Sequence, residues 1–295
     1  MSVLIHTVTP EEEGRSVREL LTARFAVSSS LRRELFRREG AVLLNGKAVF
    51  LSTRTKADDV LSIDVTDPPQ RENAIVPVDF PLSILWEDEH LLAVDKPAGI
   101  TVHGAALTEE AITVAGAAAH YLGSTAIHVV NRLDRGTTGV MLIAKSSYLH
   151  ARCLELLHTA DFCREYRAVC EGIPSPAKGM IDAPIGRDTT SLLRRCIDPA
   201  GQHAVTEYEV LSADKGRSLL RLLPHTGRTH QLRVHMASVG HPLVGDWLYG
   251  TEDLNLIARP ALHSCALTLI HPVTEELLQL EAPLPEDMKC LVPDA

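Results

Sequence analysis

Long hydrophobic runs are absent from this sequence. No apolar stretch approaches the roughly 20 residues that a membrane-spanning helix requires, and the short apolar stretch within residues 1–9 lacks the basic flank of a signal peptide. We therefore expect a cytoplasmic protein that makes no membrane contact. With 295 residues, the chain is long enough for one large domain or two unequal ones.

Paired cysteines are absent as well. The six cysteines, at positions 153, 163, 170, 196, 265 and 290, form no Cys-x-x-Cys pair, which predicts reduced thiols rather than a zinc site or a disulfide framework. The phosphate-binding patterns G-x-x-x-x-G-K-S/T and G-x-G-x-x-G, the zinc motif H-E-x-x-H and the nucleophile motif G-x-S-x-G do not occur either. We expect neither a metal nor a nucleotide cofactor.

Positive charge is scarce overall, but it is concentrated near the N-terminus. The net charge of −9 argues by itself against a nucleic-acid partner. Residues 14–56, however, hold ten basic and three acidic residues, a local charge of +7. A basic module on an acidic body is compatible with RNA binding.

Residues 14–66 have the pattern of a small α+β unit. Val17, Leu20 and Leu21 have the spacing of a helix, and Ser28–Ser30 can cap a second helix that we expect Gly40 to end. Asn45-Gly46 is a strong hairpin signal, and residues 58–65 alternate as a strand does.

This unit resembles the S-four RNA-binding domain, in which the second helix and the hairpin present a basic face. The resemblance implies that RNA is bound by the basic residues of that helix and hairpin: Arg32, Arg33, Arg37, Arg38 and Lys47. The alternative is an ordinary solvated helix face, which is what most charge runs are.

The remaining chain predicts an α+β fold with a mostly antiparallel mixed sheet flanked by helices. Residues 67–81 are proline-rich and indicate a linker, and residues 82–290 form the larger domain. We expect strands in 82–96, 137–145, 163–172, 204–211 and 218–224, and helices at 111–122, at 147–158 after a Ser146 cap, and at about 229–239 before Gly240.

Asp134 is the first candidate for chemistry. It stands between Arg132 and Arg135, just before the apolar run 140–144. An isolated charge at the mouth of a buried strand is costly, so this carboxylate is either paired in a structural ion pair or functional.

A second candidate is the block 223–250. It holds His225, Arg228, His230, Arg233 and His235 within eleven residues, where a strand leads into a helix. Helix N-termini and arginines both favour phosphate. The two histidines at 230 and 235 are five residues apart, which suits a shared metal on one helical face badly.

Four stretches together resemble the Rlu-type RNA pseudouridine synthases, which modify ribosomal and transfer RNA. They are "LLAVDKPAGITVH" (91–103), "NRLDRGTTGVMLIAKS" (131–146), "REYRAVCEG" (164–172) and "HTGRTHQLRVHMASVGHPLVGDWLYG" (225–250). The resemblance covers about residues 80–290. Asn131 and Thr138 replace a common His and Ser of the family, and both keep hydrogen-bonding capacity.

The resemblance implies a role for each of four residues. Asp134 is then the catalytic aspartate, and Arg132 enters the RNA helix where the target base has flipped out. Tyr166 stacks on the target uracil, and Arg233 forms an ion pair with the aspartate. For Tyr166 the alternative is a core aromatic residue.

Two other functions stay open from the sequence. A non-catalytic RNA-binding or ribosome-assembly factor could share this scaffold, although Asp134 is intact, and a nucleoside hydrolase would have no use for the basic module. S-four-bearing relatives mostly act on large-subunit ribosomal RNA, so we expect that substrate, with transfer RNA as the alternative. We expect a monomer.

Overall fold

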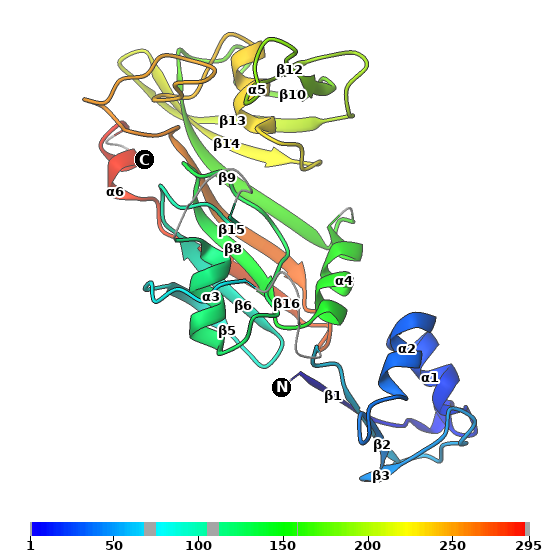
Figure 1. The fold of residues 1–295 in the computed structure, drawn as a ribbon. Coiled ribbons are helices and arrows are strands. Elements are labelled where there is room, and N and C mark those ends of the chain that lie inside the picture. Colours follow the sequence, from blue (N-terminus) through cyan, green and yellow to red (C-terminus); the bar gives the residue numbers. More distant parts are fainter. Residues whose placement is uncertain (1, 68–74, 105–111, 158, 293–295) are drawn as a thin grey trace.

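The computed structural model describes residues 2–67, 75–104, 112–157 and 159–292. A 4-stranded sheet lies near the N-terminus, a 10-stranded sheet runs through most of the remaining chain, and a 2-stranded sheet completes the set (Figure 1). Across these described ranges, no helix has the length and apolarity needed to cross a membrane.

The N-terminal unit combines a small antiparallel sheet, of order β1-β4-β2-β3, with two α-helices. Its elements are β1 (Val3–Thr7), the 3-10 helix η1 (Pro10–Glu12), α1 (Val17–Ala23), α2 (Ser29–Leu35), β2 (Val42–Leu44), β3 (Lys47–Ala48) and β4 (Val60–Asp64). Strand β1 precedes residue 14, the start predicted for this unit. Its pairing with β4 joins residues nearly 60 positions apart, so no local signal announces it.

Local signals explain the other elements of this unit. The Ser16 hydroxyl accepts from the Glu19 amide at 3.3 Å while the Glu19 carboxylate accepts from the Ser16 amide at 2.6 Å, a capping box that starts α1. The Ser28 hydroxyl accepts from the Leu31 amide at 3.2 Å and starts α2. Asn45 and Gly46 both have positive φ, +52° and +75°, as the predicted hairpin turn requires.

The basic helix ends earlier than predicted. Helix α2 stops at Leu35, so Arg37 and Arg38 lie in the turn that follows and not on the helix. Gly40 has φ +74°, but it closes this turn instead of ending the helix. The prediction that the second helix carries Arg32, Arg33, Arg37 and Arg38 is therefore wrong for the last two.

The large sheet has the order β10-β13-β14-β9-β15-β8-β6-β5, with β16 paired to β15 and β7 to β8. Among the strand pairs of the described residues, only β15–β8 is parallel, so the predicted mostly antiparallel mixed sheet is confirmed. Its strands are β5 (Ser83–Glu87), β6 (Leu91–Lys96), β7 (His128–Val129), β8 (Thr138–Ala144), β9 (Phe162–Glu171), β10 (Lys178–Asp182), β13 (Val205–Asp214), β14 (Arg217–Pro224), β15 (Leu262–Ile270) and β16 (Leu277–Glu281). The small hairpin β11 (Ile185–Arg187) and β12 (Arg195–Ile197) lies beside it.

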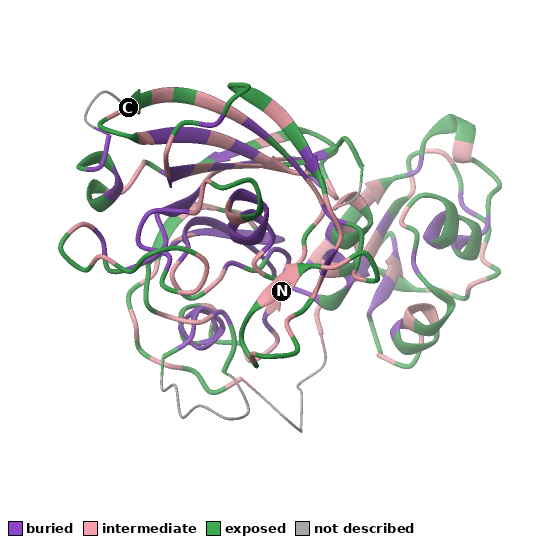
Figure 2. Cartoon of the chain, turned by 90° about the horizontal axis from the view of Figure 1, so that it is seen from above, coloured by how far each residue is buried: buried purple, intermediate pink, exposed green. Residues whose placement is uncertain are grey.

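Both faces of the large sheet are covered where the predicted chemistry lies. Alternate residues of β8 belong to different hydrophobic clusters: Val140 and Leu142 to one, Met141 and Ile143 to the other. Side chains of a strand alternate between faces, so this continuous apolar run is buried on both sides. Figure 2 shows how buried positions follow the strands.

Helices complete this part of the chain: α3 (Val114–Leu122), α4 (Ser147–Leu156), α5 (Gln231–Ser238) and α6 (Glu286–Lys289). The hydroxyls of Thr113 and Ser146 cap α3 and α4, and Gly240, at φ +86°, follows the end of α5. Residues 111 and 158, the predicted limits of the first two helices, lie outside the described residues.

The N-terminal unit is docked on the large sheet and its helix α4. The Tyr148 hydroxyl of α4 donates to the Phe25 carbonyl at 2.7 Å, and Asp67 accepts from the amide and hydroxyl of Ser147 at 3.1 and 2.5 Å. Asp67 also lies 2.5 Å from the Nε2 atom of His128. Asp67, the first residue of the predicted linker, is therefore bound to the larger unit.

Candidate active site

Asp134 lies in the loop between β7 and β8, and the buried side chain of Asn131 anchors that loop. The Asn131 side chain donates to the Val140 carbonyl at 3.1 Å and accepts from the Leu142 amide at 2.7 Å. The hydroxyl of Thr138, the other residue that departs from the common family pattern, lies 2.8 Å from the Nδ1 atom of His263. Asn131 and Thr138 thus both form hydrogen bonds, as their side chains led us to expect.

Lys96 binds the backbone of the same loop, a role that the sequence did not indicate. Its fully buried ammonium donates to the carbonyls of Pro97, Arg135 and Thr137 at 2.9, 3.2 and 2.9 Å. Burial lowers the pKa of Lys96 to about 8. The lysine fixes the backbone on both sides of the turn that follows Asp134.

Arg233 joins this loop to helix α5. One of its guanidinium nitrogens lies 3.6 Å from Oδ2 of Asp134, and two others bind the carboxylate of Asp246, each at 2.7 Å. The side chains of Arg233 and Asp246 are 6% and 0% exposed, whereas that of Asp134 is 31% exposed. The buried Asp246 therefore holds the arginine, and the more open Asp134 faces the cavity.

Asp246 was missed as a site residue, although "VGDWLYG" was part of the recognised block, because no local pattern shows that it pairs with Arg233, 13 residues earlier. Its position depends on Gly245, which has φ +72°. A Cβ atom there would lie 2.4 Å from the Arg259 carbonyl oxygen, so only glycine fits this close approach.

His230 is a second neighbour of Asp134. Its Nε2 atom lies 4.0 Å from Oδ2 of the aspartate, and its Nδ1 atom lies 2.8 Å from the Tyr249 hydroxyl. That hydroxyl accepts from the Arg195 amide at 2.8 Å, which leaves its proton available for Nδ1. Burial lowers the pKa of His230, and its backbone has φ +57°, a strained conformation of the kind that often occurs at functional sites.

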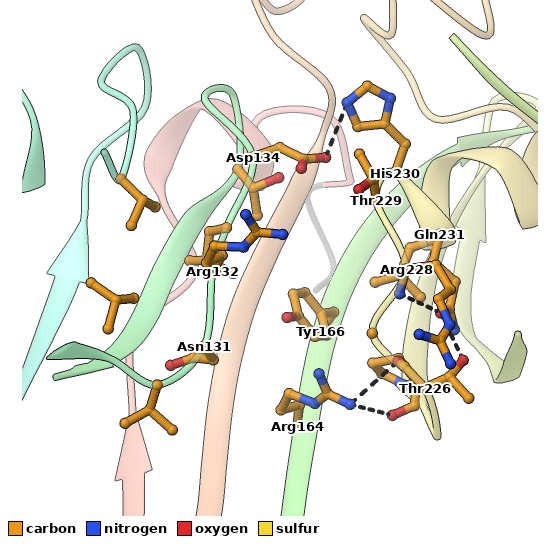
Figure 3. A pocket seen from close by; sticks show the side chains of 18 of the residues that line it. Asn131, Arg132, Asp134, Arg164, Tyr166, Thr226, Arg228, Thr229, His230 and Gln231 are labelled. Carbon is orange, nitrogen blue, oxygen red and sulfur yellow. Dashed lines mark hydrogen bonds and ion pairs between the residues drawn. The ribbon is translucent and has the colours of Figure 1, made fainter. Parts of the chain in front are cut away.

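A cavity of about 760 Å³ opens in front of these groups (Figure 3). Tyr166 of β9 lies on its wall, only 7% exposed, and burial raises the pKa of its phenol. Arg132 is exposed at the cavity, and Arg164, Arg228 and Gln231 also line it. The structure thus brings together the four residues predicted at this site, Asp134, Arg132, Tyr166 and Arg233.

Comparison with known proteins identifies the family. The model of the RNA pseudouridylate synthase family matches residues 90–238. The chain is 39% identical over 255 residues to the uncharacterized RNA pseudouridine synthase YhcT of Bacillus subtilis, covering 85% of this chain and 83% of the relative. It is 35% identical over 301 residues to ribosomal large subunit pseudouridine synthase D of Vibrio cholerae, covering 97% and 92%.

A solved human structure, RNA Pseudouridylate Synthase Domain Containing 4, superposes with a TM-score of 0.56 at 28% identity. It covers 70% of this chain and 90% of the human one. This chain belongs to the RNA pseudouridylate synthase family. The predicted family, the fold class and the isomerase activity are thereby confirmed, and the non-catalytic and nucleoside-hydrolase readings are set aside.

The matched region of this synthase runs from the start of β6 through α5. It contains Asp134, Tyr166 and Arg233, whereas Asp246 and Tyr249 follow it. Among the described residues, no group of three or more His, Cys, Asp or Glu side chains is arranged to hold a metal ion.

The five basic residues predicted to bind RNA on the N-terminal unit of the synthase differ in their exposure and in their hydrogen bonds to the protein. Arg38 binds Asp64 and the Thr66 carbonyl, each at 2.6 Å, and Arg32 donates to Thr22 and the Val27 carbonyl at 2.6 and 2.9 Å. The exposed members are Arg33, Arg37 and Lys47. None of the five lines the cavity around Asp134.

Proposed function

We propose that this synthase converts uridine to pseudouridine in large-subunit ribosomal RNA, with Asp134 as the catalytic carboxylate. The observation that carries the assignment is the pairing of Asp134 with Arg233 at a cavity walled by Tyr166. The ribosomal target rests on the relative from Vibrio cholerae, which is similar along nearly its whole length and is named for that subunit.

The reaction detaches uracil from C1′ of the ribose, rotates it and reattaches it through C5. Because substrate and product are isomers, the stoichiometry requires neither a redox cofactor nor ATP. Cleavage of the glycosidic bond builds positive charge on the sugar, which a carboxylate stabilises. Asp134 could attack C1′, add to the uracil ring or remove a sugar proton, and Arg233 keeps its carboxylate oriented in each case.

A uridine inside a helix must leave the base stack before Asp134 can reach it, at a cost of a few kcal/mol. In this proposal Arg132, which is exposed at the cavity, enters the vacated position, and the ring of Tyr166 on the cavity wall stacks on the flipped uracil. Stacking of a base on an aromatic side chain contributes about 1–3 kcal/mol, enough to offset much of that cost.

The N-terminal unit is proposed as an S-four-like RNA-binding domain that includes the predicted range 14–66 and also β1. Its exposed basic residues, Arg33, Arg37 and Lys47, would contact backbone phosphates, which fix position on an RNA without reading its sequence. We propose that the enzyme acts as a cytoplasmic monomer and needs no cofactor.

Asp134→Asn tests the catalytic assignment. The substitution keeps the size of the side chain and removes its charge, so we expect the fold and RNA affinity to persist and pseudouridine formation to fall below detection. Asp214→Asn, on the exposed β13–β14 turn, is the matched control and should retain activity. Pseudouridine mapping on ribosomal RNA from cells with and without the gene identifies the site, and substantial turnover by purified Asp134→Asn protein would refute the assignment.

A further inference from the structure

Arg164 is a cation in the cavity that the proposed mechanism does not use. It lies on β9 two residues before Tyr166, so both side chains project from the same face of the strand. Both line the cavity, and Figure 3 shows Arg164 on the side of Tyr166 that faces away from Asp134. The cavity therefore continues past the tyrosine to a second charged group.

The partners of Arg164 leave its charge uncompensated. Its terminal nitrogen donates to the carbonyls of Pro224 and Thr226, each at a long 3.3 Å, and its buried Nε atom has no hydrogen-bond partner. In the ranges that the structure describes, no carboxylate lies within ion-pair distance of Arg164, whereas Arg233 has two. A partly buried guanidinium with only neutral acceptors is costly unless an anion reaches it.

The loop after β14 lies directly against this guanidinium. Gly227 lies against it, and a Cβ atom at that position would be 3.1 Å from the Nη1 atom of Arg164. That spacing is too tight for an ordinary contact, so the glycine allows the arginine and the loop backbone to lie side by side. The loop therefore holds the guanidinium at the cavity wall, where an anion that enters the cavity can reach it.

We propose that Arg164 binds a backbone phosphate next to the flipped uridine. This inference rests on the proposed function, because it takes Tyr166 as the place of the uracil. In a nucleotide the ribose separates the base from its phosphate, so a phosphate site belongs a short distance along the wall from the base site. Two residues along β9 are about 7 Å, and the phosphate is the only anion that an RNA brings into this cavity.

The test combines protein variants with RNAs whose phosphate charge is removed. The substrate is a synthetic RNA stem-loop containing the uridine that the full-length enzyme converts, with either normal linkages or a neutral methylphosphonate on the 5′ or the 3′ side of that uridine. Single-turnover rates at subsaturating RNA are measured for the wild type, Arg164→Gln, Arg164→Lys and Arg221→Gln. Arg221 is the matched control, because it lies on the opposite face of the sheet, paired with Glu165.

We expect one of the two neutral linkages to slow the wild type by about tenfold or more, since hydrogen bonds to charged groups are worth that much. Arg164→Gln should be slowed by a similar factor on normal RNA and lose little further on the neutral one. Arg164→Lys and Arg221→Gln should keep the sensitivity of the wild type.

Two results would overturn the inference while leaving the proposed function intact. One is a wild type that converts normal and both neutral RNAs equally fast. The other is an Arg164→Gln protein that keeps the full sensitivity to the neutral linkage, as it would if the arginine only tied β9 to the loop or bound the uracil itself. If mapping finds no uridine that the enzyme converts, so that no such stem-loop can be made, the proposed function is refuted, and the inference with it.

Discussion

At the scale of single residues, the site depends on how one arginine is shared between two carboxylates. Burial alone would lower the pKa of Arg233, but Asp246 and Asp134 together raise it, so the guanidinium stays charged. The bidentate contact with Asp246, at 2.7 Å for both bonds, fixes its plane, and the 3.6 Å contact leaves Asp134 freer to move. Asp246 is thus a positioning residue for Asp134, the proposed catalytic carboxylate.

Asp246→Asn should reduce catalysis, although we place Asp246 behind Arg233 and not in contact with the substrate. Loss of one partner from a buried ion pair costs about 3 kcal/mol or more, so we expect a lower free energy of unfolding and a single-turnover rate at saturating RNA reduced about tenfold or more. Urea denaturation and rapid-quench kinetics measure the two effects. Asp287→Asn is the matched control, because Asp287 binds Arg259 through the same two-bond geometry outside the cavity. A variant that unfolds more easily but reacts at the wild-type rate would show that Asp246 is structural only.

At the scale of secondary-structure elements, the turn between β5 and β6 depends on one acid. Oδ1 of Asp88 accepts from the amides of His90 and Leu91, each at 2.7 Å, and Oδ2 lies 3.1 Å from the Nε2 atom of His271. Partial burial raises the pKa of Asp88, but the nearby His271 ring and the hydrogen bonds from the amides of Leu91 and His90 outweigh it and lower the pKa to about 2. The carboxylate therefore stabilises the turn only in its charged form.

This shift predicts an acid-dependent difference between the wild type and Asp88→Asn. The folded-state pKa is below the usual 3.8, so the contribution of Asp88 is complete above about pH 4 and is lost as the pH falls toward 2. Allowing for the partial exposure of the side chain, we expect the variant to be about 1 kcal/mol less stable at pH 7. Urea midpoints of both proteins between pH 3 and pH 7 should converge toward the acid end. A difference that stays constant down to pH 3 would contradict the role of the charge.

The elements that the sequence predicts correctly are those with local signals. Serine caps, the Asn45-Gly46 turn and the apolar run of β8 each act within a few residues, and each appears where it was expected. The recognised motifs carry Asp134, Tyr166 and Arg233, and these three residues line one cavity. Contacts between distant segments could not be predicted in this way.

Two of the missed features are long-range. Strand β1 is a strand of the small sheet because of β4, nearly 60 residues later, and Lys96 supports the loop after Asp134 across about 40 residues. The end of α2 at Leu35 was also not predicted. Residues 31–39 are mostly good helix formers, which suggests a helix that continues to Gly40, whereas the chain turns after Leu35.

At the scale of the whole molecule, the N-terminal unit and the large sheet share one core. A single hydrophobic cluster contains Leu20 and Leu61 of the small unit together with Leu142 and Leu149 of the larger one. Helix α4, on which the small unit docks through Tyr148, also lines the cavity with His150 and Leu154. If the small unit binds RNA as proposed, the shared core holds that RNA at a fixed place relative to Asp134, and removal of the unit would disturb the core as well as binding.

Substitutions on the intact chain are for this reason a cleaner test of the N-terminal unit than its deletion. Arg33, Arg37 and Lys47 are exposed, whereas Arg38 is tied to Asp64. If the three exposed residues each contact a phosphate, their joint replacement by Gln should lower RNA affinity and reduce the slope of log affinity against log salt by about 2.7 on a duplex, since each contact contributes about 0.9. The single-turnover rate at saturating RNA should stay within about tenfold of the wild type, about 1.4 kcal/mol of barrier. Arg38→Gln, the control, should lower stability and change the salt slope by much less than one contact. Fluorescence titrations at several salt concentrations on one long RNA give both slopes, and a triple variant with the wild-type slope would mean that the unit does not anchor RNA through these residues.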